Sequence, residues 1–177
     1  MATTNPSLQM VYDGWEGYQV SMVDAIKGLS REQLAYRPAP QLRSVGEIAS
    51  HISMGRIGWF QRMHAPGSDE LFDEAEGWDP EEAITENAAE LVRRLEASWR
   101  MIANTLNQWT VADLERTYLQ PYQGKTYAVS YQWTIWRVMA HDIHHGGQIA
   151  VMLGVLGIDI PELGDQGGHI TEAKLAE

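Results

Sequence analysis

The feature that most constrains the fold is a long apolar segment near the end of the chain, residues 133–158. It contains no proline, and its apolar residues recur at helical spacing, which is typical of a core helix. A buried imidazole must be hydrogen-bonded, paired or bound to a metal, because an unsatisfied buried polar group costs about 1–3 kcal/mol. A group of polar residues interrupts the centre of this segment: His141, Asp142, His144, His145 and Gln148.

Helical geometry separates these histidines from one another. At about 100° per residue, His141 and His145 lie on one apolar face, whereas His144 lies on its flank, about 90° away. Gln148 returns to the line of His141. The spacing of four residues places the two ring nitrogens roughly 6 Å apart, close enough to bind one ion. Two core histidines that hydrogen-bond to backbone or carboxylate groups explain the same spacing equally well.

The composition limits the class of protein. A chain of 177 residues with 44% hydrophobic and 21% charged residues suits one folded domain. The net charge of -11 argues against nucleic acid as the main partner, because phosphate binding needs a basic surface. Cysteine is absent from the sequence, which excludes disulfides, a thiol nucleophile and a cysteine-based zinc site. Without a secretion signal or a membrane-spanning segment, the plain expectation is a cytoplasmic protein with no membrane partner.

Three further segments have helical spacing: residues 7–28, 44–63 and about 79–108. With the segment at 133–158 they make four amphipathic helices, and strand signals are almost absent. The sequence therefore predicts an all-α, four-helix bundle as a single domain over 1–160. The polar, glycine-rich residues 161–177 predict a loosely ordered tail.

Local signals mark where these helices begin. Ser44 with Glu47 forms a capping box for the second helix. Asp79 followed by Pro80 is a strong start for the third helix. The acidic residues between these helices, 68–79, predict a solvated loop.

The segment before the last helix, residues 118–129, predicts an irregular loop or a short hairpin around Gln123 and Gly124. Ser130 is then placed to cap the last helix. A second apolar face on that helix predicts burial on both sides, against neighbouring helices or a second subunit, and we favour a homodimer. The members of this second face are Trp136, Ile143, Gly147, Ala150 and Gly154.

A third histidine lies beside the apolar stripe of the second helix. His51 has Gly55 and Gly58 on its side, which leaves space around the ring. Helical bundles build metal sites from side chains on facing helices, so His51 can join His141 and His145. Three imidazoles without a fourth protein ligand are typical of catalytic zinc and related metals, because one position stays open.

Three motifs in this order resemble a known family: residues 29–40 (LSREQLAYRPAP), residues 44–51 (SVGEIASH) and residues 141–149 (HDIHHGGQI). The sequence resembles the DinB/YfiT-like metalloprotein superfamily over roughly residues 10–160. The resemblance implies a four-helix bundle, often dimeric, that holds a divalent metal, commonly zinc or nickel. By motif position the ligands are His51, His141 and His145. Bacillithiol S-transferases and mycothiol-dependent maleylpyruvate isomerase are similar proteins, which implies a low-molecular-weight thiol as co-substrate.

We therefore expect a metal-dependent enzyme that acts on a small-molecule substrate through a metal-activated thiol or water, as an S-transferase or a hydrolase. Gln148 is the candidate catalytic residue, placed to hydrogen-bond the substrate or the water. One alternative is a non-catalytic metal- or small-molecule-binding bundle. Another is an interaction module without metal, in which the histidines are satisfied core residues.

Other residues have weaker signals. Asp142 points away from the face of His141, so we expect an acceptor role elsewhere. Arg137 could bind an anionic substrate or form a salt bridge on the helix flank. Trp59 and Trp133 could line a pocket near the metal, and two further histidines are expected to be exposed: His64 and His169.

Overall fold

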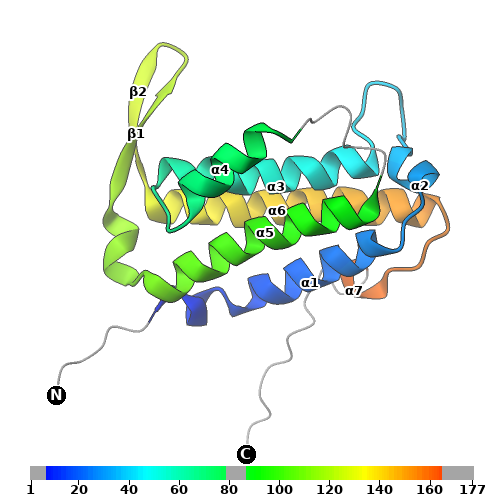
Figure 1. Ribbon diagram of the computed structural model, residues 1–177, viewed down its shortest axis with the longest axis horizontal. Coiled ribbons are helices and arrows are strands. Elements are labelled where there is room, and N and C mark those ends of the chain that lie inside the picture. The colour runs from blue at the N-terminus through cyan, green and yellow to red at the C-terminus, as the bar shows by residue number, and fades with distance from the viewer. Residues whose placement is uncertain (1–6, 79–86, 165–177) are drawn as a thin grey trace, which may run out of the picture.

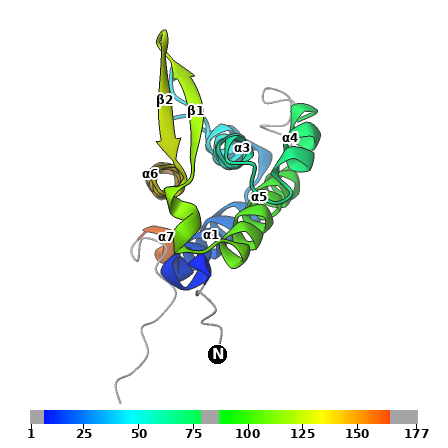
Figure 2. The same ribbon diagram turned by 90° about the vertical axis from the view of Figure 1, so that its left-hand side faces the viewer.

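The computed structural model describes residues 7–78 and 87–164, and this part of the chain is helical apart from one hairpin (Figure 1). The long helices in these ranges are α1 (Asp13–Lys27), α3 (Val45–Arg62), α5 (Ala88–Gln108) and α6 (Tyr131–Val155). Contacts join α1 to α5, α5 to α3, α3 to α6, and α6 back to α1 (Figure 2). The predicted all-α class is confirmed.

Short helical elements precede, connect and follow the long helices. They are the 3-10 helices η1 (Leu8–Val11) and η2 (Val111–Glu115), and the α-helices α2 (Arg31–Ala35), α4 (Ser68–Glu76) and α7 (Pro161–Gly164). The first predicted helix is thus divided, with η1 separate from α1. The beginning of the expected tail forms α7, which buries a leucine, and the rest of that tail lies outside the described residues.

Hydroxyl groups cap the first turn of several of these helices, including the predicted caps at Ser44 and Ser130. The Ser44 hydroxyl accepts a hydrogen bond from the backbone of Glu47, whose carboxylate accepts from the Ser44 backbone. Ser30 and Gln33 form the same box at α2, and Ser130 caps α6. Each cap satisfies a donor that the first helical turn leaves without an intrahelical partner.

The segment before α6 is a hairpin, the second of the two predicted options. Strands β1 (Thr117–Tyr122) and β2 (Lys125–Ser130) pair antiparallel over their six residues each. Gln123 and Gly124 form the turn with φ values of 48° and 74°, the left-handed conformation that a two-residue hairpin turn requires. The hairpin stands out from the end of the helical body (Figure 1).

The acidic segment after α3 was expected to be a loop, and this prediction is wrong, because residues 68–76 form α4. Asp69 and Glu70 lie in its first turn, where the helix dipole favours negative charge. Its apolar side chains are spaced to share one face, and they pack against α3 and against Trp78, two residues beyond the end of α4. The residues of this small cluster are Met54, Ile57, Leu71, Phe72, Ala75 and Trp78.

The predicted start of the third helix at Asp79 and Pro80 lies outside the described residues. Within them, Asn87 has an extended backbone, and its side chain accepts a hydrogen bond from the amide of Ala89. Asparagine is a strong N-cap. The helix therefore begins at Ala88, later than predicted.

The two apolar faces of α6 have different surroundings. The face that carries the histidines is buried against α1 and α3, as predicted, through Thr134, Val138, Ile149 and Met152. On the second face Trp136 is 57% exposed and Ile143 is 48% exposed. The described helices of the chain do not cover this face, so the expected burial against neighbouring helices is wrong. Burial against a second subunit stays a prediction. In the same residues, no helix has the length and hydropathy needed to cross a bilayer.

Candidate metal centre

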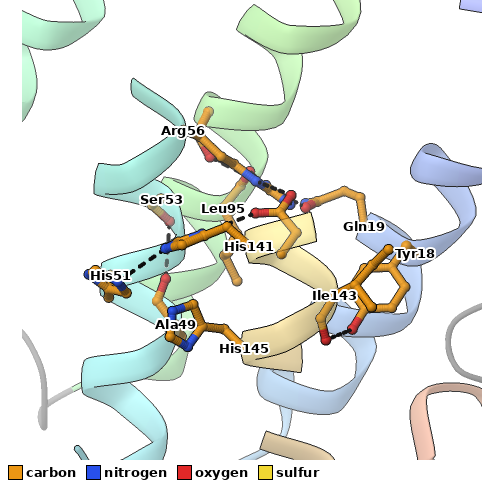
Figure 3. A network of polar contacts seen from close by, with 12 residues as sticks. Tyr18, Gln19, Ala49, His51, Ser53, Arg56, Leu95, His141, Ile143 and His145 are labelled. Atoms are coloured by element: carbon orange, nitrogen blue, oxygen red, sulfur yellow. Dashed lines mark hydrogen bonds and ion pairs between the residues drawn. The ribbon is translucent and has the colours of Figure 1, made fainter. Parts of the chain in front are cut away.

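The three predicted ligands meet between α3 and α6. His51 projects from α3 toward His141 and His145 of α6 (Figure 3). The Nε2 atoms of His51 and His141 are 3.1 Å apart. One ring nitrogen from each of the three residues can be chosen so that all lie within 4.8 Å of one another. The structure therefore brings together side chains that are 90 residues apart in the sequence.

The donor set fits a divalent transition-metal ion. Ligand nitrogens lie about 2.0–2.1 Å from zinc, so two nitrogens of one tetrahedral site are roughly 3.3 Å apart. The 3.1 Å between His51 and His141 is close to that spacing. The group consists of imidazoles alone, and imidazole suits zinc, nickel, copper and iron better than calcium or magnesium.

Burial favours the neutral form of two of the three imidazoles, His51 and His145. Burial is the largest effect on His51 and, together with the nearby charges of Arg43 and the other two histidines, it lowers the pKa of His51 to about 4. Burial also lowers the pKa of His145, although the hydrogen bond with Gln148 acts in the opposite direction. A neutral imidazole has the lone pair that a metal needs, so no proton must be displaced from these rings near pH 7.

Gln148 contacts a metal-ligand candidate directly. Its Oε1 lies 2.7 Å from Nδ1 of His145. An amide oxygen can only accept, so this ring donates from Nδ1 and keeps its lone pair on Nε2. Gln148 thus orients His145, a role beside the substrate contact predicted from the sequence.

A buried ion pair lies next to the histidines, and sequence reasoning missed half of it. Arg56 of α3 and Asp142 of α6 are both fully buried. The Arg56 Nε donates to Asp142 at 2.9 Å, and Trp15 Nε1 donates to the same carboxylate oxygen at 2.8 Å. A further Arg56 nitrogen donates to Gln19 (Figure 3). The other oxygen of Asp142 is 3.8 Å from Nδ1 of His141, too far for a hydrogen bond.

A signal for this pair exists in the sequence. Arg56 is four residues after Ile52 and four before Phe60, and both of these are fully buried. Asp142 lies seven residues from Ile135 and from Ile149, which are also fully buried. A charged residue in the middle of an apolar helical stripe has to be paired when it is buried.

Residues of α3 and α6 line two cavities, one of which reaches the histidines. One of about 800 Å³ is lined by His144, His145 and Gln148 together with Arg43. The other, of about 810 Å³, is lined by residues of both hairpin strands and by Trp59 and Trp133, but not by the three ligand candidates. His64 is exposed as predicted, and His169 lies outside the described residues. His144, which was predicted to lie on the flank of the apolar face, is also exposed.

A substitution at Gly55 tests how closely α3 and α6 must approach. A Cβ at this position would lie 2.9 Å from Cε1 of His141 and 3.4 Å from its Nε2. We expect Gly55→Ala to push this ring aside and to weaken zinc binding roughly tenfold, as measured by competition with a chromophoric chelator. The control is Gly147→Ala on α6, where an added Cβ meets nothing within 4 Å. Equal zinc affinities of the two variants would contradict this prediction.

Comparisons with known proteins agree with this architecture. The model of the DinB family matches residues 1–166. The crystal structure of a DinB-like protein from Bacillus cereus ATCC 10987 superposes with a TM-score of 0.68 and 16% sequence identity. The match covers 89% of this chain and 98% of that chain. A likeness at this identity shows the fold alone. A search of curated proteins finds no match.

Proposed function

The chain belongs to the DinB family, and we propose that it is a divalent-metal-dependent enzyme that activates a thiol or a water molecule for attack on a small-molecule substrate. It acts as an S-transferase in the first case and as a hydrolase in the second. The observation that carries the proposal is a group of three imidazoles, without a carboxylate or cysteine, of which His145 lines a cavity.

The position of the histidines favours catalysis over a purely structural ion. Structural zinc sites are normally closed by four protein ligands, whereas catalytic sites keep one position open. Within the described residues the group offers His51, His141 and His145 and no fourth ligand. His145 also lines the 800 Å³ cavity, so a small molecule in that cavity can approach the ligand nitrogens.

The protein residues have separable roles in this proposal. His51, His141 and His145 would hold the ion, and a divalent ion lowers the pKa of a thiol or water that it binds. Gln148 keeps the Nε2 lone pair of His145 available for the ion. Gln148 is exposed and also lines the cavity, so its amide NH₂ group can donate to a substrate there.

The competing function is a non-catalytic metal- or small-molecule-binding bundle. It predicts that the ion stabilises the fold and that the fourth position is blocked by protein. A structure with the ion bound distinguishes the two functions, because only the catalytic proposal needs an open or water-filled position beside the cavity.

Activity measurements test the proposal directly. Two samples are compared: protein made metal-free with a chelator, and protein loaded with zinc or nickel. Thiol transfer is assayed with a panel of low-molecular-weight thiols and a generic electrophile, and hydrolysis is assayed with activated esters. We expect metal to raise the rate with at least one thiol or ester, and Gln148→Ala to lower it roughly tenfold or more.

The control variant for this assay is His64→Ala, which changes an exposed histidine outside the group. It should react like the wild type. Equal rates for chelated and metal-loaded protein with every compound would favour the non-catalytic bundle.

Three predictions from the sequence accompany this proposal. They are zinc or nickel as the ion, a homodimer through the exposed second face of α6, and a cytoplasmic location.

A further inference from the structure

The arginines of this acidic chain divide into two groups. The sequence has 24 acidic and 13 basic residues, so carboxylate partners are plentiful. In residues 7–78 and 87–164, however, Arg43, Arg62 and Arg137 form no ion pair, and each of them lines one of the two cavities. Arginines that do pair with a carboxylate include Arg37, Arg56, Arg93, Arg94 and Arg116.

Two of these unpaired arginines are held against tryptophan rings in the 810 Å³ cavity. The guanidinium of Arg137 is 5.1 Å from the ring of Trp59 and 5.2 Å from that of Trp133. The guanidinium of Arg62 is 4.7 Å from the ring of Trp59, and it donates to the backbone carbonyl of Gly58. Contact with aromatic rings restrains a guanidinium while its N–H groups stay available to a ligand.

The remaining wall of the cavity matches a ligand with one anionic end. Both hairpin strands contribute apolar and aromatic side chains, among them Tyr122, Tyr127 and Val129. No carboxylate is among the described residues that line it, so nothing in the wall opposes an anion. A volume of about 810 Å³ lies within the range of small-molecule sites, roughly 300–1,000 Å³.

We propose that this cavity binds a small molecule that carries an oxyanion, a carboxylate or a phosphate, on an aromatic or other apolar body. Arg62 and Arg137 bind the oxyanion through charge-assisted hydrogen bonds, and the tryptophan and tyrosine rings contact the body. Arg137 lies one helical turn, about 6 Å, before His141 on the same face of α6. If the function proposed above holds, this anionic molecule is the substrate that extends toward the histidines.

Calorimetric titration of metal-free protein tests the binding site. The probes are 2-naphthoate, 2-naphthyl phosphate and the neutral 2-naphthamide. We expect at least one of the two anionic probes to bind, with one molecule per chain, and the neutral amide to bind far more weakly. Arg62→Gln and Arg137→Gln should each raise the dissociation constant roughly tenfold to a hundredfold. Arg100→Gln, at an exposed arginine of α5 outside both cavities, should leave it unchanged.

The outcomes separate this proposal from the metal-dependent activity. Preference for naphthoate or for naphthyl phosphate identifies the oxyanion, and either result supports the site. Equal affinity for the amide, no binding at millimolar probe, or wild-type affinity in both arginine variants overturns it. His141→Ala should bind the probes like wild type, and Arg137→Gln should keep its metal content. Loss of anion binding and loss of metal are therefore independent results.

Discussion

Asparagine in place of Asp142 is expected to destabilise the protein by about 3–5 kcal/mol, because it leaves the buried Arg56 guanidinium without a counter-charge. The carboxylate has no contact with solvent and accepts hydrogen bonds from Arg56 and from Trp15. Urea unfolding measures the change in the free energy of unfolding. The protein is first made metal-free with a chelator, so that metal binding does not contribute to the measured stability. For a domain stable by about 5–15 kcal/mol, this loss is a large share of the total.

Two comparisons show whether burial causes this effect. Glu74→Gln removes an exposed ion pair with Arg93, whose side chains are 53% and 45% exposed, and should change stability by less than about 1 kcal/mol. The double variant Arg56→Met with Asp142→Asn should recover part of the loss of Asp142→Asn, because the uncompensated charge is gone. A loss from Asp142→Asn as small as that from Glu74→Gln would contradict the structural account.

The histidine group could be predicted because helical geometry is local. A spacing of four residues puts His141 and His145 on one face whatever the rest of the chain does. The packing of His51 opposite them is not local, and the apolar stripes of both helices together with the family resemblance were needed to predict it. The contact that confirms it is the 3.1 Å between the Nε2 atoms of His51 and His141.

The pairing of Arg56 with Asp142 could not be predicted with the same ease. The two residues are 86 positions apart, and none of the three sequence motifs contains both. Each is a charged residue in the apolar stripe of its own helix, but only the packing of the helices shows that the two charges form an ion pair. Gln19 and Trp15 complete the network from α1.

The helix α4 shows a different limit. Its sequence is dominated by acidic residues, which by composition resemble a solvated loop. Helix formation there depends on a few apolar side chains, such as Leu71 and Ala75, that pack against α3. Tertiary packing of one face stabilises a short helix more than its intrinsic propensity does.

Alanine in place of His51, His141 or His145 is expected to abolish stable binding of a divalent metal. Binding free energies of zinc sites are on the order of 10 kcal/mol, so loss of one of three ligands should weaken affinity by at least about a hundredfold. Elemental analysis of protein purified without an affinity tag measures the metal content, and competition with a chelator measures the affinity for the metal.

The strictest control for this result is His144→Ala, because its ring centroid is only 4.9 Å from that of His145, yet it lies outside the metal-ligand group. Metal binding stabilises a folded protein by about 2.7 kcal/mol at a hundredfold excess over the dissociation constant. Wild type and His144→Ala should therefore show a rise in the unfolding midpoint on addition of zinc, whereas the three ligand variants should not. Full metal content in His141→Ala, or its loss in His144→Ala, would show that the ion binds elsewhere. A wild-type protein that neither contains nor gains metal would favour the alternative without metal, in which the histidines are core residues that hydrogen-bond to one another. The Nε2 atoms of His51 and His141 lie within hydrogen-bonding distance.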